Sequence, residues 1–388
     1  MSLGIILYSN PDYYPPTLNL IWLLKQKHKI CIFSRNMADV DDSFYDGIEH
    51  YRFGKNLSAT DCIKASPLLK LLEYLLFVFK TTVHAIKCEC KVVVVYDPYA
   101  LLPAILLKMI NQKINIFYHE HELTILNKDK VNSLAYWVKK IVYRNLNRCS
   151  WISQADVRRA EVFQKKLNLQ KVESVRNFSL KTFDYEKKKN NLCSEYKEKG
   201  YMVFGFIGLV SIDSYIDDLI RFVENTKLKI FIALAGYRWG DDIFERMSKF
   251  EDKFNDSKIA YLNSLNVQAK YNFINSIDVG LILYKFKKGN IEMGAGASNK
   301  VGEYMAFGKP IIYPEWWDYE PFYKEIGLSY KDENEIVHNI ERLSTDSALR
   351  EKLSSNAIGI FNEKNNYESE TKEMIKLIDK FMWKNEKQ

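Results

Sequence analysis

The sequence of 388 residues predicts an α/β protein with two tandem Rossmann-like, doubly wound domains. Three observations lead to this fold class. Short apolar runs recur at intervals long enough for helices, and the pattern stops in a polar stretch and then starts again. The chain is also too long for one hydrophobic core, and its 47% of apolar residues are enough to fill two.

The first domain is predicted at 1–180 from six strand-like runs. These runs are continuous, which is typical of parallel strands that helices cover on both faces. They lie at 3–8, 30–33, 92–96, 114–118, 151–153 and 172–175. A solvated linker is predicted at 181–200, because Lys187, Lys188 and Lys189 stand together in a polar stretch.

The second domain is predicted at 201–365, where the strand pattern begins again. Its strand-like runs lie at 202–207, 229–235, 258–262, 278–283 and 310–313, and a last helix follows within 366–388. Ligands of such sheets bind beyond the carboxyl ends of the strands. We therefore expect the two domains to face each other across one cleft.

The composition argues against several other classes of protein. Only 9 Pro and 16 Gly are present, without a repeat, which disfavours disordered, fibrous and solenoid folds. No apolar run reaches the roughly 18 residues of a membrane span, and the first ten residues read as a strand instead of a signal peptide, so we expect a cytoplasmic protein. The six cysteines lack C-x-x-C spacing, and we expect reduced thiols instead of a zinc site or disulfides.

The positive charge is concentrated in the first half of the chain. Residues 1–190 hold 29 Lys and Arg against 18 Asp and Glu, whereas residues 191–388 hold 27 against 31. This asymmetry indicates that the first half faces something anionic, such as a membrane surface, a phosphorylated lipid or a nucleic acid.

One stretch, ASNKVGEYMAFGKP at 297–310, predicts a short helix of about ten residues and its ligand. Ser298 or Asn299 can cap its start, and Gly308 before a proline ends it. The N–H groups at the helix start, with Lys300 beside them, suit a phosphate. Glu303, one turn further, can accept hydrogen bonds from a vicinal diol, so the expected ligand is a nucleotide.

At these residues the chain resembles the retaining glycosyltransferases of the GT-B fold, family 4 type, whose donor motif reads S-x-K-x-x-E-Y-M-A-x-G-K-P. The resemblance implies that Glu303 binds the donor ribose and that the last helix crosses back onto the first domain. The family usually has a second glutamate eight residues earlier, where this chain has Ala295. It also usually has a basic residue soon after the first strand of the second domain, where this chain has Asp213.

The residues expected to bind the donor lie mostly at strand ends of the second domain. Gly208 and Leu209 follow the run at 202–207, where a glycine lets a phosphate approach the backbone, although a tight strand-to-helix turn explains it equally well. A capping box of Ser214 and Asp217 is expected next. The full donor set is Gly208, Leu209, Arg238, Tyr284, Ser298, Asn299, Lys300 and Glu303.

The acceptor side is expected at His119-Glu120-His121-Glu122, directly after the strand at 114–118. The segment resembles the D-S-H-E-L type sequence of the same family, which implies a sugar or acceptor role for His121 and Glu122. Asp97 and His119 are further candidates at strand ends. A structural cap or a metal site are the alternatives for this segment.

We expect an enzyme that moves a sugar from a nucleotide-diphosphate donor to an acceptor hydroxyl, with Glu303, Lys300, His121 and Glu122 as its central residues. Because helix N–H groups and Lys300 can stabilise the leaving diphosphate, no metal or other cofactor is expected, and Asp39-Val40-Asp41 is not expected to bind one. If the reaction inverts, Glu122 or His121 is the expected base. A nucleotide-sugar epimerase or hydrolase and a non-catalytic saccharide-binding protein are the alternatives; nucleic-acid binding is not expected.

The residue pattern of an expected helix at 134–148 indicates where the acceptor lies. Its apolar face, Trp137, Val138, Ile141 and Val142, is flanked by a row of basic residues, Lys140, Arg144 and Arg148. This layout is typical of helices that lie on an anionic membrane surface. We therefore expect peripheral binding at the inner face of the cytoplasmic membrane and a saccharide or lipid-linked saccharide acceptor, as in bacterial surface polysaccharide synthesis.

Overall fold

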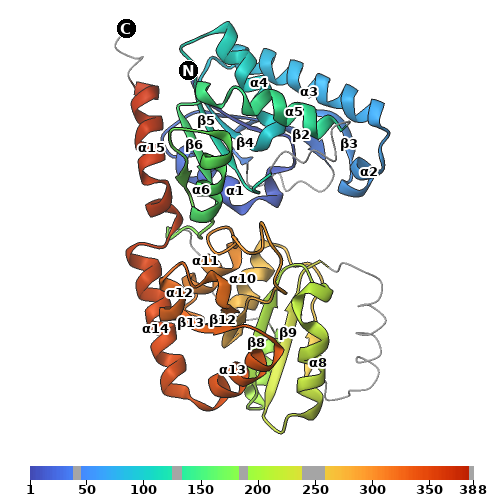
Figure 1. Cartoon of the computed structure of the whole chain (residues 1–388), viewed down its shortest axis with the longest axis vertical. Helices are drawn as coiled ribbons and strands as arrows, with labels where there is room; N and C mark the ends of the chain where they lie inside the picture. The colour runs from blue at the N-terminus through green and yellow to red at the C-terminus, as the bar shows by residue number, and fades with distance from the viewer. Residues whose placement is uncertain (38–44, 125–132, 183–190, 238–257, 384–388) are drawn as a thin grey trace. The chain divides into compact units, whose positions relative to one another are not determined.

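The computed structural model describes residues 1–37, 45–124, 133–182, 191–237 and 258–383. The chain divides into two compact units, which Figure 1 shows in the colours of the sequence. Unit 1 consists of Met1–Asn177 with Tyr367–Gln388, and unit 2 of Phe178–Asn366.

Unit 1 is built on a seven-stranded sheet in the order β3-β2-β1-β4-β5-β6-β7. All its pairings are parallel. The strands are β1 Ser2–Leu7, β2 Ile30–Met37, β3 Glu49–Leu57, β4 Cys90–Tyr96, β5 Asn115–Glu120, β6 Trp151–Gln154 and β7 Glu173–Ser174. The chain leaves β1 toward one edge of the sheet and returns at β4 toward the other, which is the doubly wound topology.

The helices of unit 1 connect these strands, and the last one returns from the end of the chain. They are η1 Pro11–Tyr13, α1 Pro15–Lys25, α2 Ala59–Lys64, α3 Pro67–Lys87, α4 Asp97–Ile110, α5 Leu134–Tyr143, η4 Leu146–Arg148, α6 Val157–Leu167 and α15 Tyr367–Trp383. Helix α15 packs against α1 and β4. Asp379 of α15 bonds His28 at 2.7 Å, and Glu370 pairs with Arg176 at 2.9 Å.

Unit 2 has a six-stranded parallel sheet in the order β10-β9-β8-β11-β12-β13. Its strands are β8 Met202–Ile207, β9 Ile230–Ala235, β10 Ile259–Tyr261, β11 Val279–Leu281, β12 Ile311–Pro314 and β13 Gly327–Tyr330. Its helices are α7 Asn191–Glu198, η5 Ile212–Ser214, α8 Ile216–Asn225, α10 Val267–Ser276, α11 Asn299–Ala306, η6 Glu315–Trp317, α12 Phe322–Ile326, α13 Glu333–Thr345 and α14 Ser347–Glu363.

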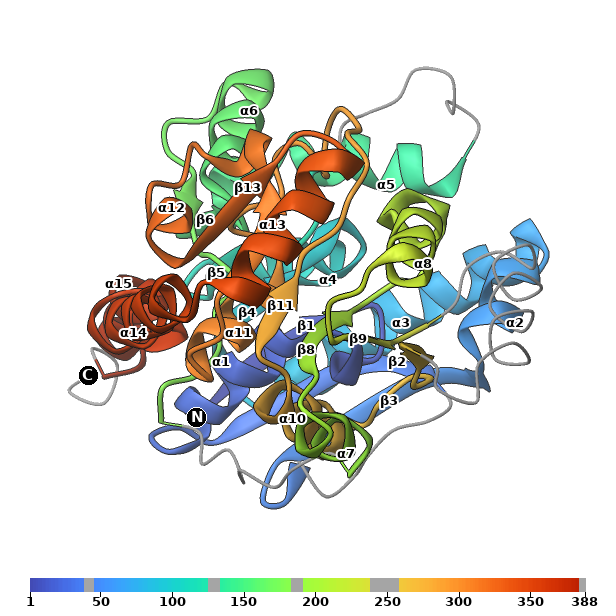
Figure 2. The same cartoon turned by 90° about the horizontal axis from the view of Figure 1, so that it is seen from below.

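Two apolar clusters cover the two faces of this sheet. The helices that contribute to them, among them α8, α10, α11 and α13, are labelled in Figure 2. One contains Leu219 of α8 and Ile340 of α13, and the other contains Phe273 of α10 and Tyr304 of α11. Burial on both faces explains why these strands are continuous apolar runs.

The predicted fold class is confirmed, and each predicted strand is present within a few residues. Two strands escaped prediction. β3 is an edge strand with only one buried residue, Phe53, so its sequence is mostly polar. β13 is a four-residue edge strand, which is too short for a pattern in sequence to reveal it.

Several local predictions were wrong. Residues 191–198, expected within a linker, form α7, and Lys187 to Lys189 lie outside the described residues. Helix α8 begins at Ile216 after a left-handed Tyr215, so the capping box at Ser214 does not form.

None of the described helices is both long enough and apolar enough to span a bilayer.

The predicted helix at 134–148 is also shorter than expected. Helix α5 ends at Tyr143, so Arg144 lies at its C-cap and Arg148 in the separate turn η4. The three basic residues therefore do not form one row on one helix. Val138 and Val142 are buried, whereas Trp137 and Ile141 are exposed.

Candidate functional site

The first candidate site lies at the point in unit 2 where the chain switches from one side of the sheet to the other, between β8 and β11. Gly208 follows β8, Tyr284 lies just beyond β11, and α11 begins at Asn299. Open α/β sheets bind ligands at this place, beyond the carboxyl ends of the strands.

Helix α11 is held against the sheet by close contacts. The Tyr304 hydroxyl donates to the Gly205 carbonyl at 3.0 Å. A Cβ atom at Gly302 would lie 2.6 Å from the Ser179 nitrogen, so only glycine permits this approach. Gly308, with φ of +61°, ends the helix as the sequence predicts.

The start of α11 carries buried polar groups that the described residues leave unpaired. Ser298 occupies the N-cap position as predicted, but its side chain makes no capping hydrogen bond. Its Oγ, like Oδ1 of Asn299, has no hydrogen-bond partner in the described part of the chain. Such groups are costly in a folded protein unless they serve a ligand.

Lys300 supplies a positive charge next to these groups. Its Nζ lies 4.6 Å from the centre of the Phe206 ring and 4.5 Å from that of Tyr284. No carboxylate of the described residues pairs with it. A Cβ atom at Gly208, where φ is +139°, would lie 2.8 Å from Lys300 Cε. The ammonium is therefore positioned by two aromatic rings and stays available to an anion at the end of β8.

A cavity of about 250 Å³ lies beside Gly208. Gly208 and Gly236 approach so closely that a Cβ at Gly236 would lie 1.9 Å from the Gly208 carbonyl oxygen, which keeps this edge of the cavity free of side chains. The lining residues are Ile207, Gly208, Leu209, Ala235, Gly236, Tyr237, Ser264, Leu265 and Lys270. Most ligand sites measure roughly 300–1,000 Å³, so this cavity suits a part of a larger ligand.

Glu303, expected to bind the donor ribose, is not an ordinary solvent-exposed helix residue. It is 5% exposed, and its Oε1 accepts a hydrogen bond from Nζ of Lys270, which lines the cavity. Sequence analysis missed Lys270, because its partner is 33 residues away and no motif surrounds it. Lys270 therefore lies between the cavity and the Glu303 carboxylate, whose charge it compensates.

Ala295 stands where the family has its second glutamate, and aromatic side chains surround it. It is fully buried; its N–H donates to the Tyr319 hydroxyl at 3.3 Å, and its carbonyl accepts from Tyr323 at 2.7 Å. Leu209 is exposed to 49%. Arg238 and the Asp39–Asp41 segment lie outside the described residues.

The second candidate site lies at the corresponding switch point of unit 1, between β1 and β4. Asp97 follows β4 with φ of +66°, a strained conformation for a residue other than glycine. Its Oδ1 accepts from the His121 N–H and its Oδ2 lies 2.9 Å from His121 Nδ1. Asp97 and His121, both expected on the acceptor side, are thus brought together.

His121 is almost fully enclosed. Its ring stacks between Tyr96 and Tyr14, with centroid distances of 5.0 and 4.5 Å, and its Nε2 lies 3.3 Å from the Thr17 hydroxyl. Both ring nitrogens therefore have protein partners. This geometry favours a residue that positions Asp97 over a base that takes a proton from substrate.

Burial dominates the titration of this segment. Burial acts to raise the pKa of Asp97, but the charge and hydrogen bonds of His121 hold it below its ordinary value. Burial lowers the pKa of His119 to about 3 and raises that of Glu120 to about 7. Glu120 is fully buried and accepts hydrogen bonds from Tyr118 at 2.8 Å and Tyr143 at 2.9 Å.

Glu122 differs from its neighbours in the segment. Its side chain is 61% exposed and pairs with Nη1 of Arg159 at 3.1 Å. Arg159, which is buried, also donates to the His121 carbonyl at 2.9 Å. Glu122 is therefore tied to the fold through Arg159 while its carboxylate stays accessible.

Comparison with known proteins supports the expected resemblance. Residues 217–376 match a family model described as glycosyl transferase-like. A comparison with curated protein sequences gives no match.

Solved structures match over nearly the whole chain. HepE from Anabaena in complex with UDP has 13% identity and a TM-score of 0.67, covering 98% of this chain and 100% of its own. Sucrose-phosphate synthase from Thermosynechococcus elongatus has 11% identity and a TM-score of 0.70, covering 98% of each chain. The E. coli trehalose-6-phosphate protein bound with UDP-2-fluoro glucose has 11% identity and a TM-score of 0.72, covering 96% of this chain and 98% of its own. At these identities the likeness shows the fold. Residues 217–376 are thus similar to a glycosyl transferase-like family, and the solved structures show that the whole chain has the GT-B fold that the signature motif implies.

Proposed function

We propose that the protein transfers a sugar from a nucleoside-diphosphate sugar to an acceptor hydroxyl and binds this donor in unit 2. The observation that carries the proposal is the start of α11, where Ser298, Asn299 and Lys300 present polar and positive groups that the described residues leave unpaired. Similar folds were solved with UDP and UDP-glucose, which makes a uridine nucleotide the first donor to test.

The diphosphate would lie between the start of α11 and Gly208. There the helix dipole, the Ser298 hydroxyl and the Lys300 ammonium all favour negative charge. The nucleoside would extend into the cavity beside Gly236, where Glu303 accepts ribose hydroxyls while Lys270 holds its other oxygen.

The chemistry follows from this placement. The bond between the anomeric carbon and the diphosphate breaks, and the same groups stabilise the charge that develops on the leaving oxygen. We propose retention, in which the acceptor attacks from the same face and its proton passes to the leaving phosphate. Asp97, which His121 positions, then acts on acceptor or sugar hydroxyls. No divalent ion is needed, because Lys300 and α11 supply the positive charge.

Nucleotide release from a panel of nucleotide sugars, with and without candidate acceptors, tests the proposal. Acceptor-dependent release with a new glycoside supports transfer. Release without acceptor indicates a hydrolase, a changed sugar indicates an epimerase, and binding without turnover indicates a saccharide-binding protein. Loss of activity in EDTA that Mg²⁺ or Mn²⁺ restores would contradict the metal-free mechanism.

We also propose that unit 1 binds an anionic membrane surface at the cytoplasmic face and that the acceptor is lipid-linked. The corrected α5 supports this only through Trp137, Ile141 and Lys140, whose ammonium lies 4.6 Å from the Trp137 ring. The stronger support comes from α3, which packs on α4 as α5 does (Figure 1).

Helix α3 exposes an unusual number of large apolar side chains. They are Leu68, Leu71, Leu72, Leu75, Leu76, Phe79 and Ile86. The single acidic residue of the helix, Glu73, is buried and accepts from the Lys55 N–H, so the exposed charges, such as Lys80 and Lys87, are basic. An apolar face with basic residues suits anionic lipid better than a second copy of the same face, which would bring like charges together.

Cosedimentation with phosphatidylglycerol vesicles tests the membrane proposal. Leu72→Ser with Phe79→Ser should abolish binding, and Lys80→Glu with Lys87→Glu should weaken it at low salt. Ile358→Ser, an exposed apolar residue of α14 in unit 2, is the matched control. Absence of wild-type binding, or binding that the α3 variants leave unchanged, would contradict the proposal without affecting the donor site.

A further inference from the structure

Three of the six cysteines come together at the edge of the first sheet where its parallel strands begin. Cys31 lies near the start of β2, Cys88 is the C-cap residue of α3, and Cys90 begins β4. Glu49, the first residue of β3, is the register partner of Cys31. Their spacing along the sequence predicts no metal site, because separate elements supply the side chains.

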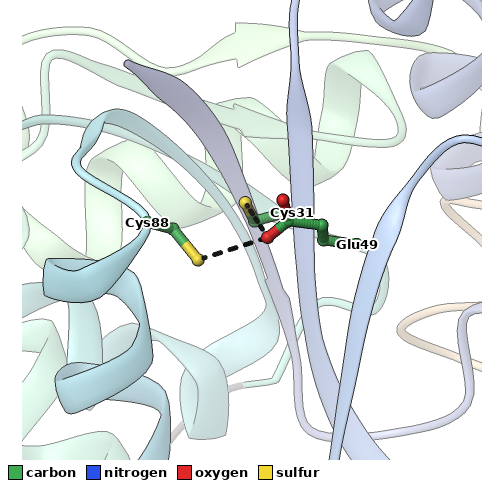
Figure 3. A group of neighbouring side chains, drawn as sticks. All are labelled: Cys31, Glu49 and Cys88. Carbon is green, nitrogen blue, oxygen red and sulfur yellow. Dashed lines mark hydrogen bonds between the residues drawn. The ribbon is translucent and has the colours of Figure 1, made fainter.

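The thiols converge on one carboxylate oxygen. Oε2 of Glu49 lies 3.7 Å from Sγ of Cys31 and 3.9 Å from Sγ of Cys88, and Figure 3 shows both thiols pointing toward it. The ligand atoms of these three residues all lie within 4.8 Å of one another. Cys90 Sγ lies 3.5 Å from the Ser2 hydroxyl and is not one of these three ligand atoms.

These spacings match the edges of a small tetrahedral site. With Zn–S bonds of about 2.3 Å and Zn–O bonds of about 2.1 Å, tetrahedral geometry places sulfur and oxygen ligands about 3.6 Å apart. We propose that Cys31, Cys88 and Glu49 bind a Zn²⁺ ion and fill three of its four coordination positions.

The surroundings orient the carboxylate for this role. Oε1 of Glu49 pairs with Lys29 Nζ at 2.6 Å, and the Tyr51 hydroxyl donates to Oε2 at 2.8 Å. Contacts of this kind around a ligand fix its direction and are a regular feature of metal sites.

The protonation of the cluster predicts how binding depends on pH. A cysteine is ordinarily a protonated thiol at neutral pH, whereas Zn²⁺ binds the thiolate. Zn²⁺ therefore replaces thiol protons, and each Zn–S bond that forms releases one proton to solvent. Two released protons make the apparent affinity rise about 100-fold per pH unit.

The position of the site indicates its use. Asp97 and His121 lie at the carboxyl ends of the strands, whereas this cluster lies at their amino ends. The ion would join β2, β3 and the turn between α3 and β4, so its effect is on the stability of unit 1 and on the anchoring of α3.

Metal analysis of the full-length protein purified under reducing conditions tests the inference. We expect about one Zn²⁺ per chain, a fall in Tm after chelation that Zn²⁺ but not Mg²⁺ restores, and tetrahedral thiolate absorption with Co²⁺. Cys88→Ser, at a half-buried position, should lower Zn²⁺ affinity at least 100-fold. Cys149→Ser is the control outside the cluster and should leave it unchanged.

Glu49→Gln provides a second variant that removes a ligand but no thiol, and it should weaken Zn²⁺ at least tenfold. Three results would overturn the inference: no bound Zn²⁺ and no affinity in a titration with Zn²⁺ alone, equal affinity in Cys88→Ser and wild type, or a disulfide between cluster cysteines in the protein as isolated.

Discussion

The two units have the same doubly wound topology, but their switch points differ in how far the protein satisfies its own polar groups. In unit 1, Asp97 and His121 bond each other, and Thr17, Tyr14 and Tyr96 enclose the ring. In unit 2, the side-chain oxygens of Ser298 and Asn299 have no hydrogen-bond partner among the described residues, and Lys300 lies next to Gly208.

This difference indicates which of the two switch points can bind a ligand more tightly. A group already paired within the protein must exchange one hydrogen bond for another when a ligand arrives, and the net gain is small. A buried group without a partner gains the full bond. We therefore propose that unit 2 provides the affinity for the donor and that His121 positions Asp97, and substitutions should separate these two roles.

The largest expected effect is on folding, from His121→Ala in unit 1. The change removes stacking on two rings and leaves the half-buried Asp97 without its partner, which costs about 2 kcal/mol of stability. The affinity for UDP should stay within about twofold of wild type. Urea unfolding and calorimetric titration measure the two quantities, and a variant with normal stability but weak UDP binding would reverse the assignment.

Lys300→Met should have the opposite effect, with weaker UDP binding and little change in stability. It keeps the apolar stem between Phe206 and Tyr284 but removes the charge, so UDP should bind about 10- to 150-fold more weakly, as expected for a charge-assisted hydrogen bond worth about 1.5–3 kcal/mol. Lys324→Met, which removes an exposed lysine paired with Asp318, is the control. Equal affinities in the two variants would remove Lys300 from the site.

A smaller effect is expected at the N-cap. Ser298→Ala removes a buried hydroxyl without a partner among the described residues, so stability should stay equal or rise by about 1 kcal/mol. UDP should bind about fivefold more weakly, because one neutral hydrogen bond is lost. Thermal melts with and without UDP check both parts, and a destabilised variant would show that Ser298 serves as an ordinary cap.

The smallest expected effect is on the pH dependence of stability, through the two buried residues that precede His121 in the sequence, His119 and Glu120. Glu120, with its pKa raised from 4.5 to about 7, loses stability as pH rises through this window, whereas His119, lowered from 6.5 to about 3, gains stability as pH rises toward 6.5. The two slopes oppose each other between pH 5 and 6. Glu120→Gln removes the contribution of Glu120, so that only the pH dependence from His119 remains. Between pH 5 and 6 the free energy of unfolding of this variant should therefore rise by about 1 kcal/mol per pH unit relative to wild type. If the stability of the variant and of wild type changed with pH in parallel, Glu120 would be ionised in the folded protein and this prediction would be wrong.

The sequence predicts these features unevenly, for physical reasons. The strands and the ends of α11 follow from local patterns, because apolar runs, Gly308 and Pro310 act on their own neighbourhood. The signature motif likewise locates Lys300 and Glu303. Side chains that meet through the fold leave no local pattern: Lys270 reaches Glu303 from another helix, and the cysteines converge from separate elements. The early end of α5 also escaped, because nothing in the apolar pattern beyond Tyr143 shows that the helix stops.

Hydrogen exchange with and without UDP tests the central claim most directly, since it follows both switch points in one experiment. We predict protection of the backbone at 207–212 and 298–304 on binding UDP, with no change at 97–101 and 119–124. Protection confined to the unit 1 segments, or none at α11 under saturating UDP, would contradict the assignment of the donor site to unit 2.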